Sequence, residues 1–261
     1  MILVGTCGFC EAKKRYFEDF STVEVQQTFY KILQEKTLQK WRKEAPEDFV
    51  FSIKAFQGIT HPSTSPTWRR SNVKPSGNVG LLRPTEEVFK YWELTLKEAE
   101  ALGARFILIQ LPKSFRESEE SFANAEKFFE QIERKEFEIA VELRGWSERG
   151  IKKFVREFDL IDVTDLTIRE PTHGGVINYY RLHGAYQEGR IIYKHKYSEE
   201  ELRGIAKKVK EWNKAESYVY FNNVYMCDDA KRFIQIWLSN FYFFLLKASP
   251  FTARRRSEHL C

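Results

Sequence analysis

Short apolar runs alternate with amphipathic segments along the whole chain. The runs are rich in the β-branched and aromatic residues typical of strands. They lie at residues 2–5, 22–26, 49–54, 105–111, 137–144, 160–165, 179–184 and 218–223. Between them apolar residues recur every three or four positions, as at Phe122, Ala125, Phe129 and Ile132. This spacing predicts helices between the strands.

The ends of several helices are also marked in the sequence. Ser198 followed by Glu201 is typical of a capping box, Thr85 suits an N-cap and Gly103 suits the residue after a helix. Eight strands separated by helices predict a single (β/α)8 TIM-type barrel over residues 1–261. An open, doubly wound sheet is the alternative.

Alternation within the strands predicts which side chains point into the barrel. Val23 and Val25 share one face, which leaves Glu24 on the other. Outward residues pack on helices and are apolar, whereas inward residues at the carboxyl ends of the strands can be polar. The polar inward positions are Glu24, Lys54, Gln110, Glu142, Arg144, Arg181, His183 and Asn222. Their convergence predicts a ligand site at these strand ends.

The acidic and imidazole groups of this set suit acid/base chemistry. Glu24 or Glu142 would act as the base and His183 as its proton partner, with Asp165 a third carboxylate at the end of its strand. Because their strands are not neighbours, the two glutamates are expected to face each other across the mouth. The alternative is that each carboxylate is only a counter-ion for the basic groups beside it.

The remaining polar residues suit an anionic, hydroxyl-rich ligand such as a sugar phosphate or a nucleotide-like molecule. Lys54, Arg144 and Arg181 would hold negative charge, while amides would read hydroxyl groups. The expected ligand-binding set is Lys54, His61, Gln110, Arg144, Arg181, Asn222 and Asn223. If the protein is an enzyme, these residues predict a hydrolase or an isomerase.

Two long connections, residues 57–84 and 184–197, follow the third and seventh strands and combine basic with aromatic residues. Such loops can bind phosphates and stack bases. The predicted nucleic-acid contacts are Arg69, Arg70, Arg190, Lys194 and Lys196. A non-catalytic nucleic-acid-binding protein is therefore the alternative function, and two solvated loops are the simpler interpretation.

Composition narrows these choices only slightly. The chain has 42 Lys and Arg against 37 Asp and Glu, a net charge of +5, so indiscriminate polyanion binding is not expected.

The start of the chain shows no export signal. The apolar stretch 233–248 is too short and too interrupted for a membrane span, so it predicts a buried final helix. We therefore expect a cytoplasmic protein. The basic segment 252–261 is expected to be a flexible end.

Cofactor and cysteine chemistry receive little support from the sequence. No organic cofactor motif occurs, so no organic cofactor is assigned. The residues that could supply metal ligands show no metal-ligand spacing, so no metal is assigned; they are His61, His173, His183, Glu24, Glu142 and Asp165. The four cysteines are too few for a disulfide scaffold in a chain of this length. Although barrel closure would bring Cys7, Cys10 and Cys227 near one another, we expect reduced thiols.

Several segments together resemble one known family. They are GTCGF at 5–9, VEVQQTFY at 23–30, FVFSIKAFQGITHP at 49–62, LIQLP at 108–112, VELRGW at 141–146, YYRLHG at 179–184 and YFNN at 220–223. In order and spacing the chain resembles the YecE-like family, domain-of-unknown-function family 72. The resemblance implies a TIM-type barrel, loosely related to sugar isomerases and apurinic-site endonucleases, without an established activity. Gln26, Cys7 and Cys10 depart from the residues usual in that family.

Overall fold

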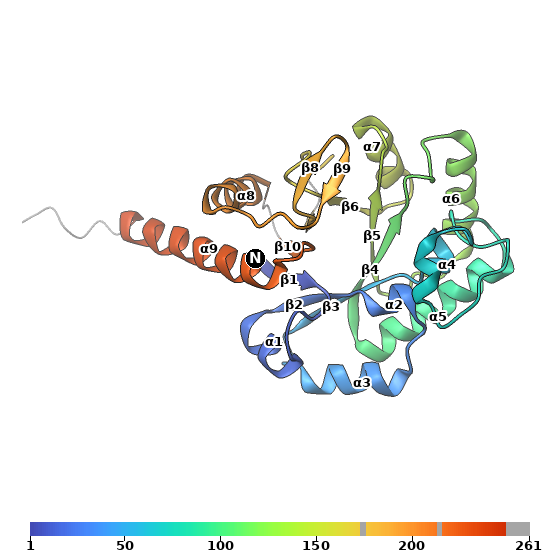
Figure 1. Cartoon of the computed structure of the whole chain (residues 1–261), viewed down its shortest axis with the longest axis horizontal. Helices are drawn as coiled ribbons and strands as arrows, with labels where there is room; N and C mark the ends of the chain where they lie inside the picture. The colour runs from blue at the N-terminus through green and yellow to red at the C-terminus, as the bar shows by residue number, and fades with distance from the viewer. Residues whose placement is uncertain (173–175, 213–215, 249–261) are drawn as a thin grey trace, which may run out of the picture.

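A closed barrel of eight parallel strands forms the centre of the protein (Figure 1). The computed structural model describes residues 1–172, 176–212 and 216–248. The barrel strands are β1 (Ile2–Cys7), β2 (Thr22–Val25), β3 (Val50–Lys54), β4 (Ala104–Leu111), β5 (Glu138–Leu143), β6 (Ile161–Thr164), β7 (Ile177–Leu182) and β10 (Glu216–Phe221). The first and last strands pair in parallel and close the barrel. The predicted (β/α)8 fold is confirmed, and the open-sheet alternative is wrong.

Helices cover the outside of the barrel. The longer ones are α1 (Lys13–Asp19), α3 (Glu35–Glu44), α5 (Glu86–Leu102), α6 (Glu119–Gln131), α7 (Glu148–Glu157), α8 (Glu199–Trp212) and α9 (Met226–Ala248). Shorter turns are α2 (Gln27–Tyr30), α4 (Gln57–Thr60) and the 3₁₀ helix η1 (Pro66–Arg70). The connection from β6 to β7 has no helix in its described part. No helix in the described ranges is long and apolar enough to cross a membrane.

The predicted helix ends are confirmed. Thr85 Oγ1 accepts a hydrogen bond from the Val88 N–H at the start of α5, and Gly103 ends this helix with φ of 62°. Ser198 and Glu201 form the reciprocal capping box before α8, with donor–acceptor distances of 2.7 and 3.1 Å. These contacts satisfy backbone groups that a helix leaves without partners.

Two apolar clusters follow from the strand alternation. Outward residues such as Val23, Ile53 and Val141 pack against the helices in the larger cluster. The second cluster lies inside the barrel, where large rings fill the interior beneath the polar residues of the strand ends. These rings include Phe106, Tyr179 and Tyr220. The hydroxyls of these tyrosines are satisfied, because Tyr179 bonds with Ser52 at 2.8 Å and Tyr220 with Thr22 at 2.7 Å. Because these rings fill the interior, the space at the carboxyl ends of the strands is left for polar side chains.

A β-hairpin occupies the connection after β7, where the sequence predicted a long loop. Strands β8 (Ala185–Gln187) and β9 (Arg190–Ile192) pair antiparallel. Glu188 and Gly189 between them have φ of 49° and 72°. Positive φ at both central residues is typical of a two-residue hairpin turn.

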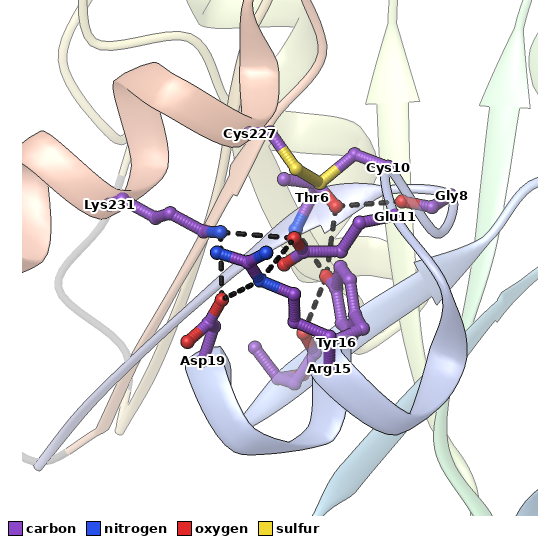
Figure 2. The surroundings of a disulfide bond; sticks show 10 residues. Thr6, Gly8, Cys10, Glu11, Arg15, Tyr16, Asp19, Cys227 and Lys231 are labelled. Atoms are coloured by element: carbon purple, nitrogen blue, oxygen red, sulfur yellow. Dashed lines mark hydrogen bonds and ion pairs between the residues drawn. A yellow bond between two sulfur atoms is a disulfide. The ribbon is translucent and has the colours of Figure 1, made fainter.

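A disulfide joins the two ends of the barrel sequence. Cys10, in the β1–α1 loop, is bonded to Cys227 in the first turn of α9 (Figure 2), with a Cα–Cα distance of 5.7 Å. The expectation of reduced thiols is therefore wrong for this pair, because barrel closure places these loops side by side. Cys7 is free and buried.

Two further expectations lie outside the described residues. The predicted flexible basic end, residues 252–261, is one of them, and His173 is the other.

Candidate functional site

A pocket of about 650 Å³ opens at the carboxyl ends of the barrel strands. Its walls come from the ends of β4, β5 and β7, the loop after β6, and the β8–β9 hairpin. Of the residues predicted to form the site, it is lined by His61, Gln110, Glu142, Arg144, His183 and Arg190. The pocket therefore lies where the alternation pattern places it, and where TIM barrels carry their active sites.

Arg181 links the two predicted glutamates at the bottom of the site. Its Nε lies 3.0 Å from Glu24 Oε2, and its Nη1 donates a hydrogen bond to Glu142 Oε2. The Arg181 side chain is 1% exposed, and Tyr179 adds a hydrogen bond to Glu24 of 2.7 Å. Burial opposes the charge of Arg181, but Glu24 and Glu142 hold its pKa well above the ordinary value. The two glutamates thus share one guanidinium, and Glu24 is not among the residues that line the pocket.

Glu142 is held as a carboxylate. Arg144 Nε donates to its Oε1 at 2.5 Å, and Arg181 occupies the other oxygen. Burial alone would raise the pKa of Glu142, but Arg144 and Arg181 lower it well below its ordinary value. A carboxylate stabilised in this way is a weak proton acceptor. Its geometry suits a group that fixes the two guanidiniums, of which Arg144 lines the pocket and Arg181 does not.

His183 and Asp165 form a hydrogen-bonded pair at the end of β7. His183 Nδ1 lies 3.0 Å from Asp165 Oδ2, which also accepts the His183 backbone N–H at 3.0 Å. Thr167 holds the other Asp165 oxygen through its backbone N–H and hydroxyl at 3.0 and 2.7 Å. A carboxylate accepts hydrogen bonds, so Nδ1 carries the proton and Nε2 keeps a lone pair. Asp165 therefore sets both the tautomer and the orientation of the ring.

The other ring nitrogen of His183, Nε2, accepts hydrogen bonds from two arginines. Nε2 lies 3.4 Å from Arg144 Nη2 and 3.4 Å from Arg181 Nη1. Glu142 Oε2 is 3.6 Å away. This arrangement places a proton acceptor, the imidazole, beside two positive guanidiniums. An anionic ligand held by a guanidinium can then have its exchangeable proton near the imidazole.

Lys54 lies behind the wall formed by Gln110. Its Nζ donates to Gln110 Oε1 at 2.8 Å and lies 3.8 Å from the centre of the Phe29 ring. Burial, followed by repulsion from Arg181 and Arg144, lowers the pKa of Lys54 to about 7.

Neighbouring His61 is kept neutral near pH 7. Burial, Lys54 and Arg144 lower the pKa of His61 to about 3. Its Nδ1 lies 2.8 Å from Thr60 Oγ1.

The hairpin forms the outer wall of the pocket. Tyr186, Arg190 and Tyr193 line this wall and are exposed. Lys113, from the loop after β4, donates to the Gly189 carbonyl at 2.9 Å and ties the hairpin to the opposite rim. Aromatic rings beside basic groups suit a phosphorylated ligand with a ring or hydroxyl face.

The two asparagines predicted to bind the ligand lie outside the pocket. Asn223 Nδ2 donates to His195 O and to Asp229, at 2.8 and 2.6 Å, and so supports the loops around α9. Asn222 is half-buried and is not among the residues that line the pocket.

The predicted nucleic-acid residues are also dispersed. Arg69 and Arg70 are exposed, and Arg70 lies over the Tyr30 ring at 3.7 Å. Lys194 is exposed, and Lys196 pairs with Asp228 at 2.6 Å. Among the five predicted basic residues, only Arg190 lines the pocket.

Some residues of the pocket were not singled out from the sequence. Lys113 and Trp146 line it, and the role of Asp165 as the partner of His183 was not predicted. Asp165 was recognisable as a carboxylate at a strand end, but its contact with the next strand depends on the three-dimensional arrangement.

One group of possible metal ligands occurs within the described residues. It consists of Cys10, Glu11 and Cys227. The two sulfurs are bonded to each other, so neither offers the thiolate that a metal requires. Glu11 instead pairs with Lys231 at 3.1 Å (Figure 2).

A closed eight-stranded barrel with an ion-paired polar pocket at its strand ends defines the protein as a TIM-barrel protein. Residues 13–241 match the family model described as "Protein of unknown function DUF72". The chain belongs to that family, which confirms the resemblance seen in the sequence.

Known relatives agree with this assignment. UPF0759 protein YunF of Bacillus subtilis is 44% identical over 45 residues, which are 17% of this chain and 16% of that protein. A DUF72 family protein of Enterococcus faecalis has a TM-score of 0.69 and 20% identity, covering 91% of this chain and 96% of that structure.

More distant barrels share the fold alone. A D-tagatose 3-epimerase-like protein has a TM-score of 0.58 and 12% identity, covering 95% of this chain and 100% of that one. Endonuclease IV of Thermus thermophilus has a TM-score of 0.53 and 12% identity, covering 91% and 99% of the two chains.

Proposed function

We propose that the strand-end pocket binds a small anionic, hydroxyl-rich ligand of the sugar-phosphate or nucleotide class and acts on it by acid/base chemistry. The observation that carries this proposal is the His183–Asp165 pair, whose Nε2 accepts hydrogen bonds of 3.4 Å from the guanidiniums of Arg144 and Arg181. A positioned imidazole moves protons near neutral pH, and adjacent arginines stabilise negative charge that develops nearby.

The residues divide into three roles. Arg144, with Arg190 on the hairpin, binds the anionic group. Gln110 forms a hydrogen bond with a hydroxyl or carbonyl oxygen. His183 accepts the proton, with Asp165 as its positioning residue. Glu142 keeps the arginines in place, and its depressed pKa makes it the poorer base. An isomerase or a hydrolase fits these roles.

Nucleic-acid binding remains the alternative, with less support. Arg69, Arg70, Lys194 and Lys196 do not line the pocket, so the two basic loops do not combine into one groove there. Small phosphorylated ligands fit a pocket of about 650 Å³.

Thermal unfolding with added ligands tests the proposal. A ligand that binds only the folded state raises the unfolding midpoint. We expect ribitol 5-phosphate, ribose 5-phosphate or adenosine monophosphate to raise it, and we expect Arg144→Met to abolish the shift. The control is Lys196→Met, a rim position outside the pocket, which should keep the shift. Stabilisation by a single-stranded oligonucleotide, with none by the small phosphates, would favour the alternative.

A further inference from the structure

Three side chains of metal-ligand type meet where the β1–α1 loop contacts the first turn of α9 (Figure 2). The sulfurs of Cys10 and Cys227 and a carboxylate oxygen of Glu11 all lie within 4.8 Å of one another. No other such group of three or more ligands occurs in the described part of the chain. None of the three residues lines the strand-end pocket, so this cluster is a separate feature of the protein.

Glu11 has one carboxylate oxygen available for a further partner. Its Oε2 pairs with Lys231 Nζ at 3.1 Å and with Arg15 Nε at 3.4 Å. Its Oε1 is buried and has no hydrogen-bond partner among the described residues. A buried oxygen without a partner costs free energy. A cation bound to Oε1 would therefore stabilise the folded protein.

The basic groups beside Glu11 are already balanced by two acids. Asp19 pairs with the same two side chains, at 2.7 Å from Lys231 and 3.5 Å from Arg15. Glu11 and Asp19 together therefore offset Lys231 and Arg15. Two thiolates formed from the disulfide would add two negative charges, which a divalent cation neutralises.

The backbone positions of the two cysteines suit a shared metal ion. Their Cα atoms are 5.7 Å apart, and a tetrahedral zinc ion with Zn–S bonds of about 2.3 Å holds its two sulfurs roughly 3.8 Å apart. Rotation of the side chains gives this separation once the S–S bond is broken. The three residues are half-buried, so water can supply the fourth ligand. Thiolate ligands favour Zn²⁺ over Mg²⁺ and Ca²⁺, which prefer oxygen ligands alone.

We propose that Cys10, Cys227 and Glu11 form a zinc site that opens when the disulfide is reduced. A dithiol reductant gives two electrons and two protons to the disulfide, the S–S bond breaks and two thiols form, while the reductant becomes a disulfide. Zn²⁺ then binds both sulfurs and the Glu11 carboxylate, and the two thiol protons are released to water. The β1–α1 loop is thus joined to α9 in both states, by the S–S bond in one and by the ion in the other. This inference does not depend on the proposed function.

Cobalt binding tests the inference, because thiolate-bound Co²⁺ gives a near-ultraviolet charge-transfer band and tetrahedral Co²⁺ gives strong visible bands. The full chain is reduced with a phosphine, moved into anaerobic buffer without reductant and titrated with Co²⁺ below its unfolding midpoint. We expect these bands in the reduced protein, their loss when Zn²⁺ is added, and none in the oxidised protein. Glu11→Gln should weaken metal binding by at least about tenfold, since even groups that only orient a metal ligand contribute that much. The control, Glu18→Gln, changes an exposed acid on α1 and should bind as the unmodified protein does.

Alkylation mapping identifies the sulfur ligands in the unmodified sequence. Iodoacetamide should modify Cys10 and Cys227 in the reduced, zinc-free protein, and Zn²⁺ should protect both. Zn²⁺ should also raise the unfolding midpoint of the reduced protein but not that of the oxidised protein. If the reduced protein binds neither ion, or if Zn²⁺ leaves the two cysteines open to alkylation, the inference is wrong. Cobalt bands with unchanged affinity in Glu11→Gln would overturn the assigned ligand set.

Discussion

Arg181 shows how one buried side chain organises the site. Its guanidinium contacts Glu24, Glu142 and the ring nitrogen of His183 while being 1% exposed. Desolvating three charges is costly, and the ion pairs of Arg181 with both glutamates offset that cost. The same contacts hold Glu142 and His183, which line the pocket.

Removal of this guanidinium should therefore be strongly destabilising. We expect Arg181→Met to lower the free energy of unfolding by about 3–5 kcal/mol, because buried Glu24 loses its arginine and Glu142 keeps only Arg144. Arg190→Met, on the exposed hairpin, should change it by less than about 0.5 kcal/mol. Denaturant titration of the two variants measures the difference, and equal effects would contradict this account of the buried cluster.

A second buried group, Glu98 on α5, predicts a pH dependence. Its Oε1 accepts the Leu33 N–H at 2.6 Å, while its Oε2 has no hydrogen-bond partner among the described residues. Burial raises the pKa of Glu98 to about 8 from 4.5. Between these values the folded state keeps a proton that the unfolded state has lost, so stability falls as pH rises, by up to about 1.4 kcal/mol per pH unit.

Glu98→Gln should flatten this slope between pH 5 and 8. The control is Glu93→Gln, an exposed position on the same helix. Unfolding midpoints measured across this range provide the test. A slope that Glu98→Gln leaves unchanged would show that the carboxyl is ionised in the folded protein.

At the scale of elements, the strands were predictable because alternation has a local cause. Inward Glu142 and outward Val141 follow from the pleat alone, and the capping box at Ser198 is equally local. The β8–β9 hairpin was missed because three-residue strands carry too little pattern. Its turn is Glu-Gly rather than the Asn-Gly or Asp-Gly that marks such turns most clearly.

Contacts between elements were harder to predict. The His183–Asp165 hydrogen bond joins the ends of β6 and β7, and its geometry depends on where the β6 strand stops. The disulfide depends on the closure of β1 against β10, which brings together residues 217 positions apart. The sequence placed these sulfurs near one another but did not determine whether they bond.

The disulfide yields a prediction at this scale. A cross-link over so long a loop stabilises the folded state mainly by restricting the unfolded chain, typically by about 2–4 kcal/mol. Reductant should therefore lower the unfolding midpoint of the protein. The Cys10→Ser, Cys227→Ser double variant should start at the lower midpoint and show no response to reductant. An unchanged midpoint after reduction, verified by thiol mass labelling, would contradict a stabilising role.

At the scale of the whole molecule, the barrel separates stability from chemistry. The aromatic lower layer and the outer shell of helices hold the strands, and the polar residues gather at one end. In the proposed function, ligand specificity depends on the ion-paired pocket and on the hairpin that forms its outer wall. Similar barrels use the same division for many different reactions, so the ligand has to be found by experiment.

The central claim is that this pocket holds a sugar phosphate with its reacting atoms at His183. A crystal structure of the protein soaked with ribitol 5-phosphate tests it most directly. We expect the phosphate within hydrogen-bond distance of Arg144 or Arg190, and a hydroxyl or adjacent carbon within reach of His183 Nε2. Density for the ligand at another surface, or a pocket that holds only solvent at saturating ligand, would contradict the account.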